Sequence, residues 1–367
     1  MQDKVTRPWI SRQLFLFTHP NDLKADLSLK HEDVLYVLDR LDFEQFIPMP
    51  SQYQGRPKED RCAILRSFVA KSILNCATTR SLIDRLEADP VLRRLMGWER
   101  KGDIPSESTF SRAFHEFSKA KVLELIHEHL IKTTYENRII GHVSRDSTSI
   151  EAREKPMHKP KNTTVKIPQK RGRKAKGALP VSLPEPTRLA KQLNQTFAEM
   201  LKDLPTACDK AGKKDSKGNT HYWNGYKLHI DTADGDVPIS AILTSASVHD
   251  SQVAIPLSIK SRHRTSNIFY ELMGAAYDAK EIIQHIEANG SVPLIDPNNR
   301  GSQTPKILAP HEKQRYKQRS SAERTNSQLK DNFGGSNLRV RGGEKVFTHL
   351  MFGVLALAVV QIGRLLI

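Results

Sequence analysis

The spacing of apolar residues changes along the chain at about residue 136, and this change limits the folds that are possible. Before it, segments such as residues 62–76 repeat apolar side chains every three or four positions, which is typical of helices. After it, segments such as residues 222–231 and 237–246 alternate apolar and polar side chains, as strands do. The expected order of strand, strand, strand, helix, strand, helix, strand predicts an α/β fold with a mixed sheet and flanking helices.

These patterns predict two domains that meet near residue 135. Residues 1–135 form the expected all-α N-terminal domain, and residues 136–367 form the sheet domain. In the first domain, Ser106 is the predicted N-cap of a helix. Short helices followed by a helix that exposes Arg112 resemble a helix-turn-helix unit that binds DNA. A small helical domain that binds nothing fits the same pattern, so both interpretations stay open.

The net charge of +16 is concentrated in one part of the chain. Residues 155–220 contain sixteen lysines and arginines but only five acids, a net charge of +11, and they are rich in Pro, Gly, Ser and Thr. We interpret this segment as a basic insertion or linker that interrupts the second domain. Its centre could follow a phosphate track through Arg171, Arg173 and Lys174. The alternative is a solvated, disordered tether with only non-specific affinity for DNA.

Composition also indicates which classes of partner the protein can bind. A strongly basic chain favours nucleic acid, because each neutralised phosphate releases a counterion, although a merely solubilising surface is the alternative. Three cysteines, Cys62, Cys76 and Cys208, lack metal-ligand or paired spacing, which fits a reducing cytoplasm. The ten uncharged residues at 351–360 are too few to span a bilayer. We therefore expect a buried helix there and no membrane partner.

Four residues near the C-terminus form the sharpest pattern. At 100° per residue they fall on a helical stripe only about 60° wide; they are Tyr316, Arg319, Glu323 and Lys330. A helix would present an aromatic ring, two cations and one carboxylate on one face. That face suits a metal-binding carboxylate that lies among phosphate-binding groups. The alternative is a charged face that is only solvated. A strand at residues 138–144 also delivers Asp146 at its end, where an ordinary turn residue is the alternative.

The spacing of this stripe, Tyr-x2-Arg-x3-Glu-x6-Lys, resembles the signature of bacterial insertion-sequence transposases of the Asp-Asp-Glu type. Other segments resemble motifs of this family in the expected order, at residues 55–57, 105–112, 146–148, 225–229, 248–251 and 342–346. The similarity covers nearly the whole chain except the basic segment. The chain is thus identified as a member of the family.

The resemblance implies an RNase H-like fold in which two Asp and one Glu meet around two divalent ions. It implies that Asp146 and Glu323 are catalytic metal ligands, with Mg²⁺ as the expected ion and Mn²⁺ as an alternative. It implies further that Tyr316, Arg319 and Lys330 contact phosphates near the cleaved end. The implied activity is transposition, in which water frees a 3′-hydroxyl at the element's end and that hydroxyl attacks target DNA.

The resemblance also implies partners and a place in the cell. The expected partner is double-stranded DNA, namely the terminal inverted repeats of the element and the target DNA. The expected assembly is a homodimer on DNA, because transposition brings two ends together. The expected location is the bacterial cytoplasm, in association with the nucleoid.

Position 274 departs from the family. The pattern Asp-x-x-Tyr-Asp, which carries the second catalytic Asp, here reads Gly-Ala-Ala-Tyr-Asp at residues 274–278. Gly274 belongs either to a decayed or repurposed copy or to an altered form of an active protein, unless Asp278 or Asp250 supplies the ligand instead. We favour loss of the ligand, because metal sites rarely tolerate a shift of several ångströms. Asp250 is better explained as the cap of a helix that begins at Ser251.

Two functions from different classes therefore remain. One is a transposase whose cleavage and strand transfer are impaired by the missing carboxylate. The other is a transposase-derived DNA-binding protein without catalysis. A purely hydrolytic nuclease is a weaker third hypothesis, because the signature is typical of transposition.

Overall fold

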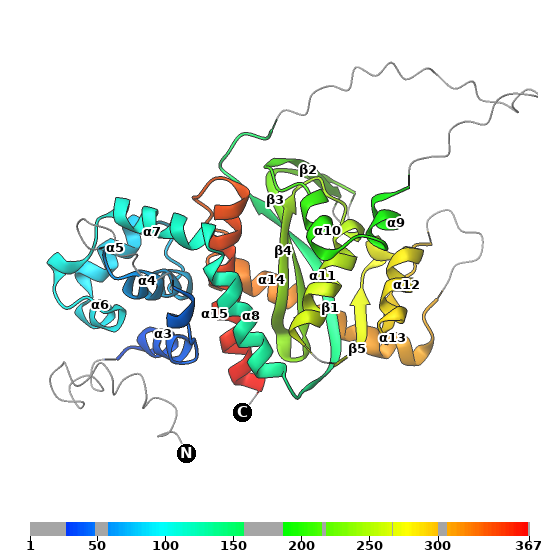
Figure 1. Ribbon diagram of the computed structural model, residues 1–367, viewed down its shortest axis with the longest axis horizontal. Coiled ribbons are helices and arrows are strands. Elements are labelled where there is room, and N and C mark those ends of the chain that lie inside the picture. Colours follow the sequence, from blue (N-terminus) through cyan, green and yellow to red (C-terminus); the bar gives the residue numbers. More distant parts are fainter. Residues whose placement is uncertain are drawn as a thin grey trace, which may run out of the picture.

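The computed structural model describes most of the chain, namely residues 27–47, 58–157, 186–214, 218–265, 267–299 and 307–365. Three predicted DNA contacts, Arg171, Arg173 and Lys174, lie outside the described residues. Helices come first and are followed by a six-stranded mixed sheet with helices on its faces (Figure 1). The predicted fold class is confirmed.

The N-terminal helices begin at capping residues. The described ones are α3 (Leu29–Asp39), α4 (Arg61–Ile73), α5 (Thr79–Ala88), α6 (Pro90–Met96), α7 (Glu107–Lys119) and α8 (Val122–Tyr135). The side chains of Asp60, Thr78 and Asp89 accept hydrogen bonds from first-turn N–H groups of α4, α5 and α6. Ser106 precedes α7 as predicted, but its hydroxyl bonds to the Thr109 hydroxyl and not to a backbone N–H.

The sheet is built around β3. Its strands are β1 (Ile139–Glu151), β2 (Asp209–Lys214), β3 (Thr220–Ala233), β4 (Val237–Ser245), β5 (Asn267–Met273) and β6 (Val292–Ile295). One edge of β3 pairs antiparallel with β1, and its other edge pairs antiparallel with β2 and β4 in turn. β5 lies parallel to β1, and β6 lies parallel to β5. The order is β2-β3-β1-β5-β6, with β4 beside β3.

β1 is longer than the sequence predicted. The strand continues past Asp146 to Glu151, so Asp146 lies within it, opposite Ile230 of β3, and not at its end. The segment after Asp146 still alternates, with Thr148 and Ile150 buried, and this signal was missed. Asp146 is therefore paired with β3, whereas the pairing of β1 with β5 ends one residue earlier, at Arg145.

Helices cover both faces of the sheet. They are α9 (Arg188–Gln192), α10 (Phe197–Asp203), α11 (Ser251–Arg264), α12 (Lys280–Ala288), α13 (Pro310–Tyr316), α14 (Ser320–Asn332) and α15 (Gly343–Leu365). α11 packs on one face of β3 and β4, with α9, α10 and α12 against it. α14 crosses β1 and β3 on the opposite face and contacts α15.

Part of the predicted basic insertion belongs to the folded body. α9 and α10 pack on α11, and β2 is an edge strand that pairs with residues 220–225. The predicted insertion at about 155–220 is therefore too long at its C-terminal end. Sequence reasoning missed β2 because its sequence, DKAGKK, has no alternation of apolar residues.

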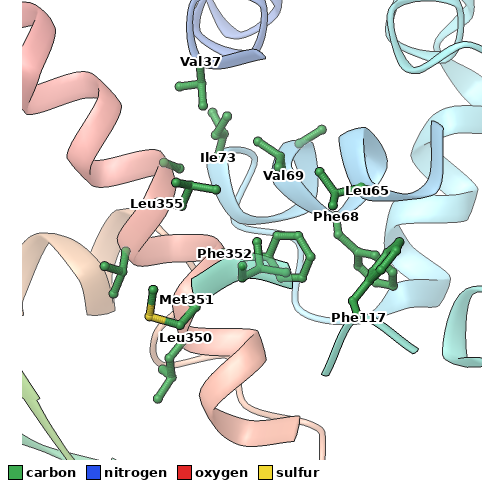
Figure 2. Packing of buried hydrophobic residues seen from close by; sticks show 14 of the residues in the cluster. Val37, Leu65, Phe68, Val69, Ile73, Phe117, Leu350, Met351, Phe352 and Leu355 are labelled. Atoms are coloured by element: carbon green, nitrogen blue, oxygen red, sulfur yellow. The ribbon is translucent and has the colours of Figure 1, made fainter. Parts of the chain in front are cut away.

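α15 joins the N-terminal helices to the sheet. It contacts α4, α7, α8 and β4, and Figure 1 shows it between the two parts of the molecule. Phe352 of α15 packs against Phe68 of α4 (Figure 2). Its ring also stacks on Phe114 of α7. It is the one described helix long and apolar enough to cross a membrane, and 83% of its apolar stretch is buried in the protein. The predicted buried helix is confirmed, although it is longer than the ten-residue run suggested.

Candidate active site

The candidate site lies where β1, β5 and α14 meet. Arg145 of β1 pairs with Met273, the last residue of β5, so Gly274 follows directly beside Asp146. α14 crosses this face, where the Asn326 amide donates to the Asp146 carboxylate at 3.3 Å. The sheet register and the crossing helix thus bring the first predicted acid next to position 274.

Arg319 is the centre of this arrangement. It immediately precedes α14, and its Nη1 donates to the Glu323 carboxylate, one turn along the helix, at 2.5 Å. It also interacts electrostatically with Asp146. Arg319 therefore connects Glu323, Asp146 and position 274, three positions that the sequence singled out separately.

Position 274 has room for a side chain. Gly274 has φ −76° and ψ 170°, a conformation that any residue adopts. A Cβ added there would lie 3.4 Å from Nη2 and 3.5 Å from Nε of Arg319, which is ordinary van der Waals contact. The Nε of Arg319 is buried and has no hydrogen-bond partner among the described residues. The guanidinium therefore lies beside position 274 with one donor unpaired.

Tyr316 and Lys330 lie at the two ends of the stripe. The Tyr316 hydroxyl donates to the carbonyl of Met273 at 3.2 Å, which holds the end of β5 next to Gly274. Lys330 reaches the Ser149 hydroxyl at 3.4 Å. Burial raises the pKa of Tyr316 to about 12 and lowers the pKa of Lys330. The stripe is divided between α13, a 3-10 turn and α14, and is not one continuous helix.

Asp278 and Asp250, the two possible substitutes for the missing ligand, have other partners. The exposed carboxylate of Asp278 accepts from the backbone N–H of Asn298, in the loop after β6, at 2.8 Å. Asp250 precedes α11, but its side chain does not cap the helix; it accepts from Lys227 at 2.9 Å and from Ser147. The capping interpretation of Asp250 is therefore wrong.

A buried ionic network lies on the opposite face of β1. Arg145 donates to both carboxylate oxygens of Asp231 at 2.7 and 2.8 Å and to Glu271 at 3.0 Å. Arg262 donates to the other oxygen of Glu271 at 2.7 Å. Burial opposes ionisation of Glu271, yet Arg145 and Arg262 hold its pKa below the ordinary value. Sequence reasoning missed this network, and charged residues inside otherwise apolar strands were its signal.

The remaining predicted DNA contact lies elsewhere. Arg112 is exposed on α7, where its guanidinium bonds to the Thr109 hydroxyl at 3.2 Å. It belongs to the N-terminal helices and is not brought together with the residues of α14. Its predicted role in a helix-turn-helix unit stays a prediction.

The residues present do not form a complete metal centre. Within the part of the chain that the structure describes, no group of three His, Cys, Asp or Glu side chains is placed to hold a metal ion. Arg319 forms an ion pair with Glu323 and interacts electrostatically with Asp146, and its guanidinium lies beside position 274, which carries no carboxylate. This donor set does not fit a two-metal site.

An acid within the first strand, an acid on a crossing helix and cations beside them are the parts of an enzyme that acts on phosphodiester backbones. The family model described as "Transposase DDE domain" matches residues 140–359, and one described as "Transposase domain (DUF772)" matches residues 23–116. The first covers more than half of the chain, which belongs to the DDE transposase family. No curated protein matches the sequence.

Membership confirms the predicted class. DDE transposases are nucleotidyl transferases that act on DNA and use divalent metal ions. The predictions of an insertion-sequence transposase and of DNA as partner are therefore confirmed. The roles of single residues, and of the Tyr-Arg-Glu-Lys signature, stay predictions.

Proposed function

We propose that this transposase binds the terminal inverted repeats of its element but cleaves them poorly, because position 274 carries no carboxylate. The observation that supports the proposal is the Arg319 guanidinium, which lies 3.4 to 3.8 Å from where the first side-chain atom of residue 274 would be. In this proposal Asp146 and Glu323 are the remaining ligands of a divalent ion, with Mg²⁺ preferred and Mn²⁺ as an alternative.

Electrostatics favours poor metal binding. A divalent ion held by Asp146 and Glu323 would lie close to the Arg319 guanidinium, and the two positive charges would repel each other. A carboxylate at position 274 would pair with Arg319 and offset part of this repulsion. Without it, Glu323 is the one acid that forms an ion pair with Arg319 among the described residues, so Glu323 is less available to a metal ion.

DNA binding does not need the missing ligand. We assign the contacts with phosphates near the element's end to Tyr316, Arg319 and Lys330. Further contacts come from the basic segment through Arg171, Arg173 and Lys174, and from Arg112 in the helical domain at residues 1–135. The functional form is a homodimer on double-stranded DNA in the nucleoid, where each protomer holds one end before transfer into target DNA.

Gly274→Asp tests the proposal, with Gly274→Asn as a neutral control of the same size. The Asp variant should bind Mg²⁺ and should cleave element-end DNA faster by about a hundredfold, since the restored ligand lowers the barrier by about 3 kcal/mol. The Asn variant should resemble the parent chain. Titration calorimetry measures the binding of metal, and gel assays of labelled DNA measure cleavage.

The second candidate function is a DNA-binding protein without any catalysis, and Gly274 itself favours it. Binding of DNA by the parent and both variants, with no cleavage by any, would establish this second function. Equal cleavage by the parent and the Asp variant would overturn the proposal, because another residue, Asp278 first, would then serve as the ligand.

A further inference from the structure

A second cationic site lies away from Asp146, where the N-terminal helices meet the C-terminal part of the chain. A cavity of about 570 Å³ is lined by α4, α5, α7, the end of the β1 segment, the loop before α15 and the first turns of α15. Its volume is in the range of ligand pockets. Five cations line it, with one carboxylate, Glu107; the cations are Lys71, Arg153, Arg339, Arg341 and Lys345.

Lys71 forms the floor of this cavity. The residue is only 9% exposed, and burial lowers the pKa of its ammonium. Among the described residues, its ammonium has no hydrogen bond or ion pair. Because the side chain is largely desolvated and no described acid pairs with it, an anion in the cavity would stabilise the ammonium.

The wall beside Lys71 also favours an anion. Thr78 and Thr79, at the start of the ten-residue helix α5, line the cavity. The N-terminal end of a helix carries a partial positive charge, although the N–H groups of Thr78 and Ser81 are already bonded to each other's hydroxyl groups there. Glu107 offsets little of the positive charge, because it pairs with Arg80 at 3.5 Å.

The rim distinguishes a strand of DNA from a small anion. Arg153, Arg339 and Arg341 are exposed, whereas Lys71 is buried beneath them. A free phosphate needs only the floor of the cavity. Exposed guanidinium groups around the floor suit the neighbouring phosphates of a continuous backbone.

We propose that this cavity is a second DNA-binding site, which takes a backbone phosphate on Lys71 and holds the adjoining phosphates with Arg339 and Arg341. The proposal rests on DNA being the substrate, but not on any metal at Asp146. The site joins α4 and α5 to the segment around α15, so a strand bound there would contact both parts of the protein at once.

The test measures the affinity for a labelled 30-base-pair duplex by fluorescence anisotropy at several salt concentrations. Lys71→Met removes the buried charge and keeps the stem, and Arg341→Gln removes an exposed charge. Each should weaken binding severalfold and should reduce the slope of log affinity against log salt by about 0.9 for each lost phosphate contact. Arg94→Gln, at an exposed arginine of α6 outside the cavity, is the matched control and should change neither quantity.

Two results would overturn the proposal. One is an unchanged affinity and slope in both cavity variants; Arg341→Gln decides this even where Lys71→Met fails to fold. The other is binding of inorganic phosphate by the parent chain, lost in both cavity variants, together with unchanged binding of the duplex, because the cavity would then take free phosphate. Failure of the Gly274→Asp cleavage test leaves these salt slopes unaffected, so the two proposals fail separately.

Discussion

Arg145 and Asp146 are neighbours on β1, yet their side chains lie on opposite faces of the sheet in different surroundings. On the Arg145 side, the carboxylates of Asp231 and Glu271 are fully buried and each is bonded to arginine. On the other side, Asp146 accepts a weaker bond from an amide, and Arg319 keeps an unpaired donor. The ionic network on the Arg145 side joins β1, β3 and β5, although the Nε of Arg262 also has no partner among the described residues. In our proposal, the absent ligand belongs to the other side.

Breaking the ionic network around Arg145 should have the largest effect on stability. Arg145→Met leaves Asp231 buried without its cation, so the free energy of unfolding should fall by about 3–5 kcal/mol in urea denaturation. Arg324→Met is the control, because its ion pair with Asp236 involves an arginine that is 50% exposed. That change should cost no more than about 1 kcal/mol. Similar losses in the two variants would contradict the difference between the faces.

Replacing an aspartate by asparagine should change the stability of the protein in opposite directions on the two faces of the sheet. Burial raises the pKa of Asp146 above its ordinary value of 3.8, although the Ser147 backbone and Arg319 oppose the shift. The charged form is therefore costly in the folded state, so Asp146→Asn should stabilise the protein by about 1 kcal/mol at pH 7. Asp231→Asn should destabilise it, because Arg145 loses one of its two charged partners.

The pH dependence sharpens this test. A carboxyl group with a raised pKa in the folded state begins to destabilise the protein as the pH rises above its unfolded pKa, and the penalty is complete once the pH exceeds the folded pKa. The gain from Asp146→Asn should therefore be complete at neutral pH and vanish below pH 3.8, the ordinary pKa of the group. Thermal unfolding from pH 3 to pH 8 measures it. A gain that does not change with pH would show that the charge of Asp146 is not the cause.

The smallest effect is expected at Gly274. Gly274→Ala should stabilise the fold by about 0.4–1 kcal/mol, because φ is negative and alanine restricts the unfolded chain. Gly225→Ala is the contrasting change, since φ there is +152° and a Cβ would lie 2.1 Å from its nearest backbone atom. It should destabilise the protein clearly in the same urea assay. If Gly274→Ala lowered the free energy of unfolding as much as Gly225→Ala, the side chain of Arg319 would be unable to move away from the added methyl group.

Much of the fold could be predicted from the sequence. Alternation of apolar residues located most strands, and the helical stripe located the candidate site residues before any geometry was known. β2 was not predicted, because an edge strand rich in lysine has no alternation of buried apolar residues. β1 was cut short because an aspartate was interpreted as a strand end, although its backbone bonds to β3 continue beyond it.

Other features depend on contacts between distant residues. The pairing of Arg145 with Asp231 and Glu271 joins three strands, and no local pattern encodes it. The place of Arg319 beside Gly274 depends on the crossing of α14 over the end of β5. A motif identifies which residues belong to a site, but tertiary packing determines which of them are paired and which are free.

α15 has a consequence for the order in which the protein is made. The ribosome releases the N-terminal helices long before it adds Phe352, yet this ring completes their core against Phe68 and Phe114. Domains usually fold as they emerge, the N-terminal one first. Here the helices α4 and α7 wait for α15, and until then the apolar faces that it covers stay open to solvent. A chain stopped before α15 would therefore lack the ring that packs on Phe68 and Phe114, so the N-terminal helices reach their final packing only after α15 is made.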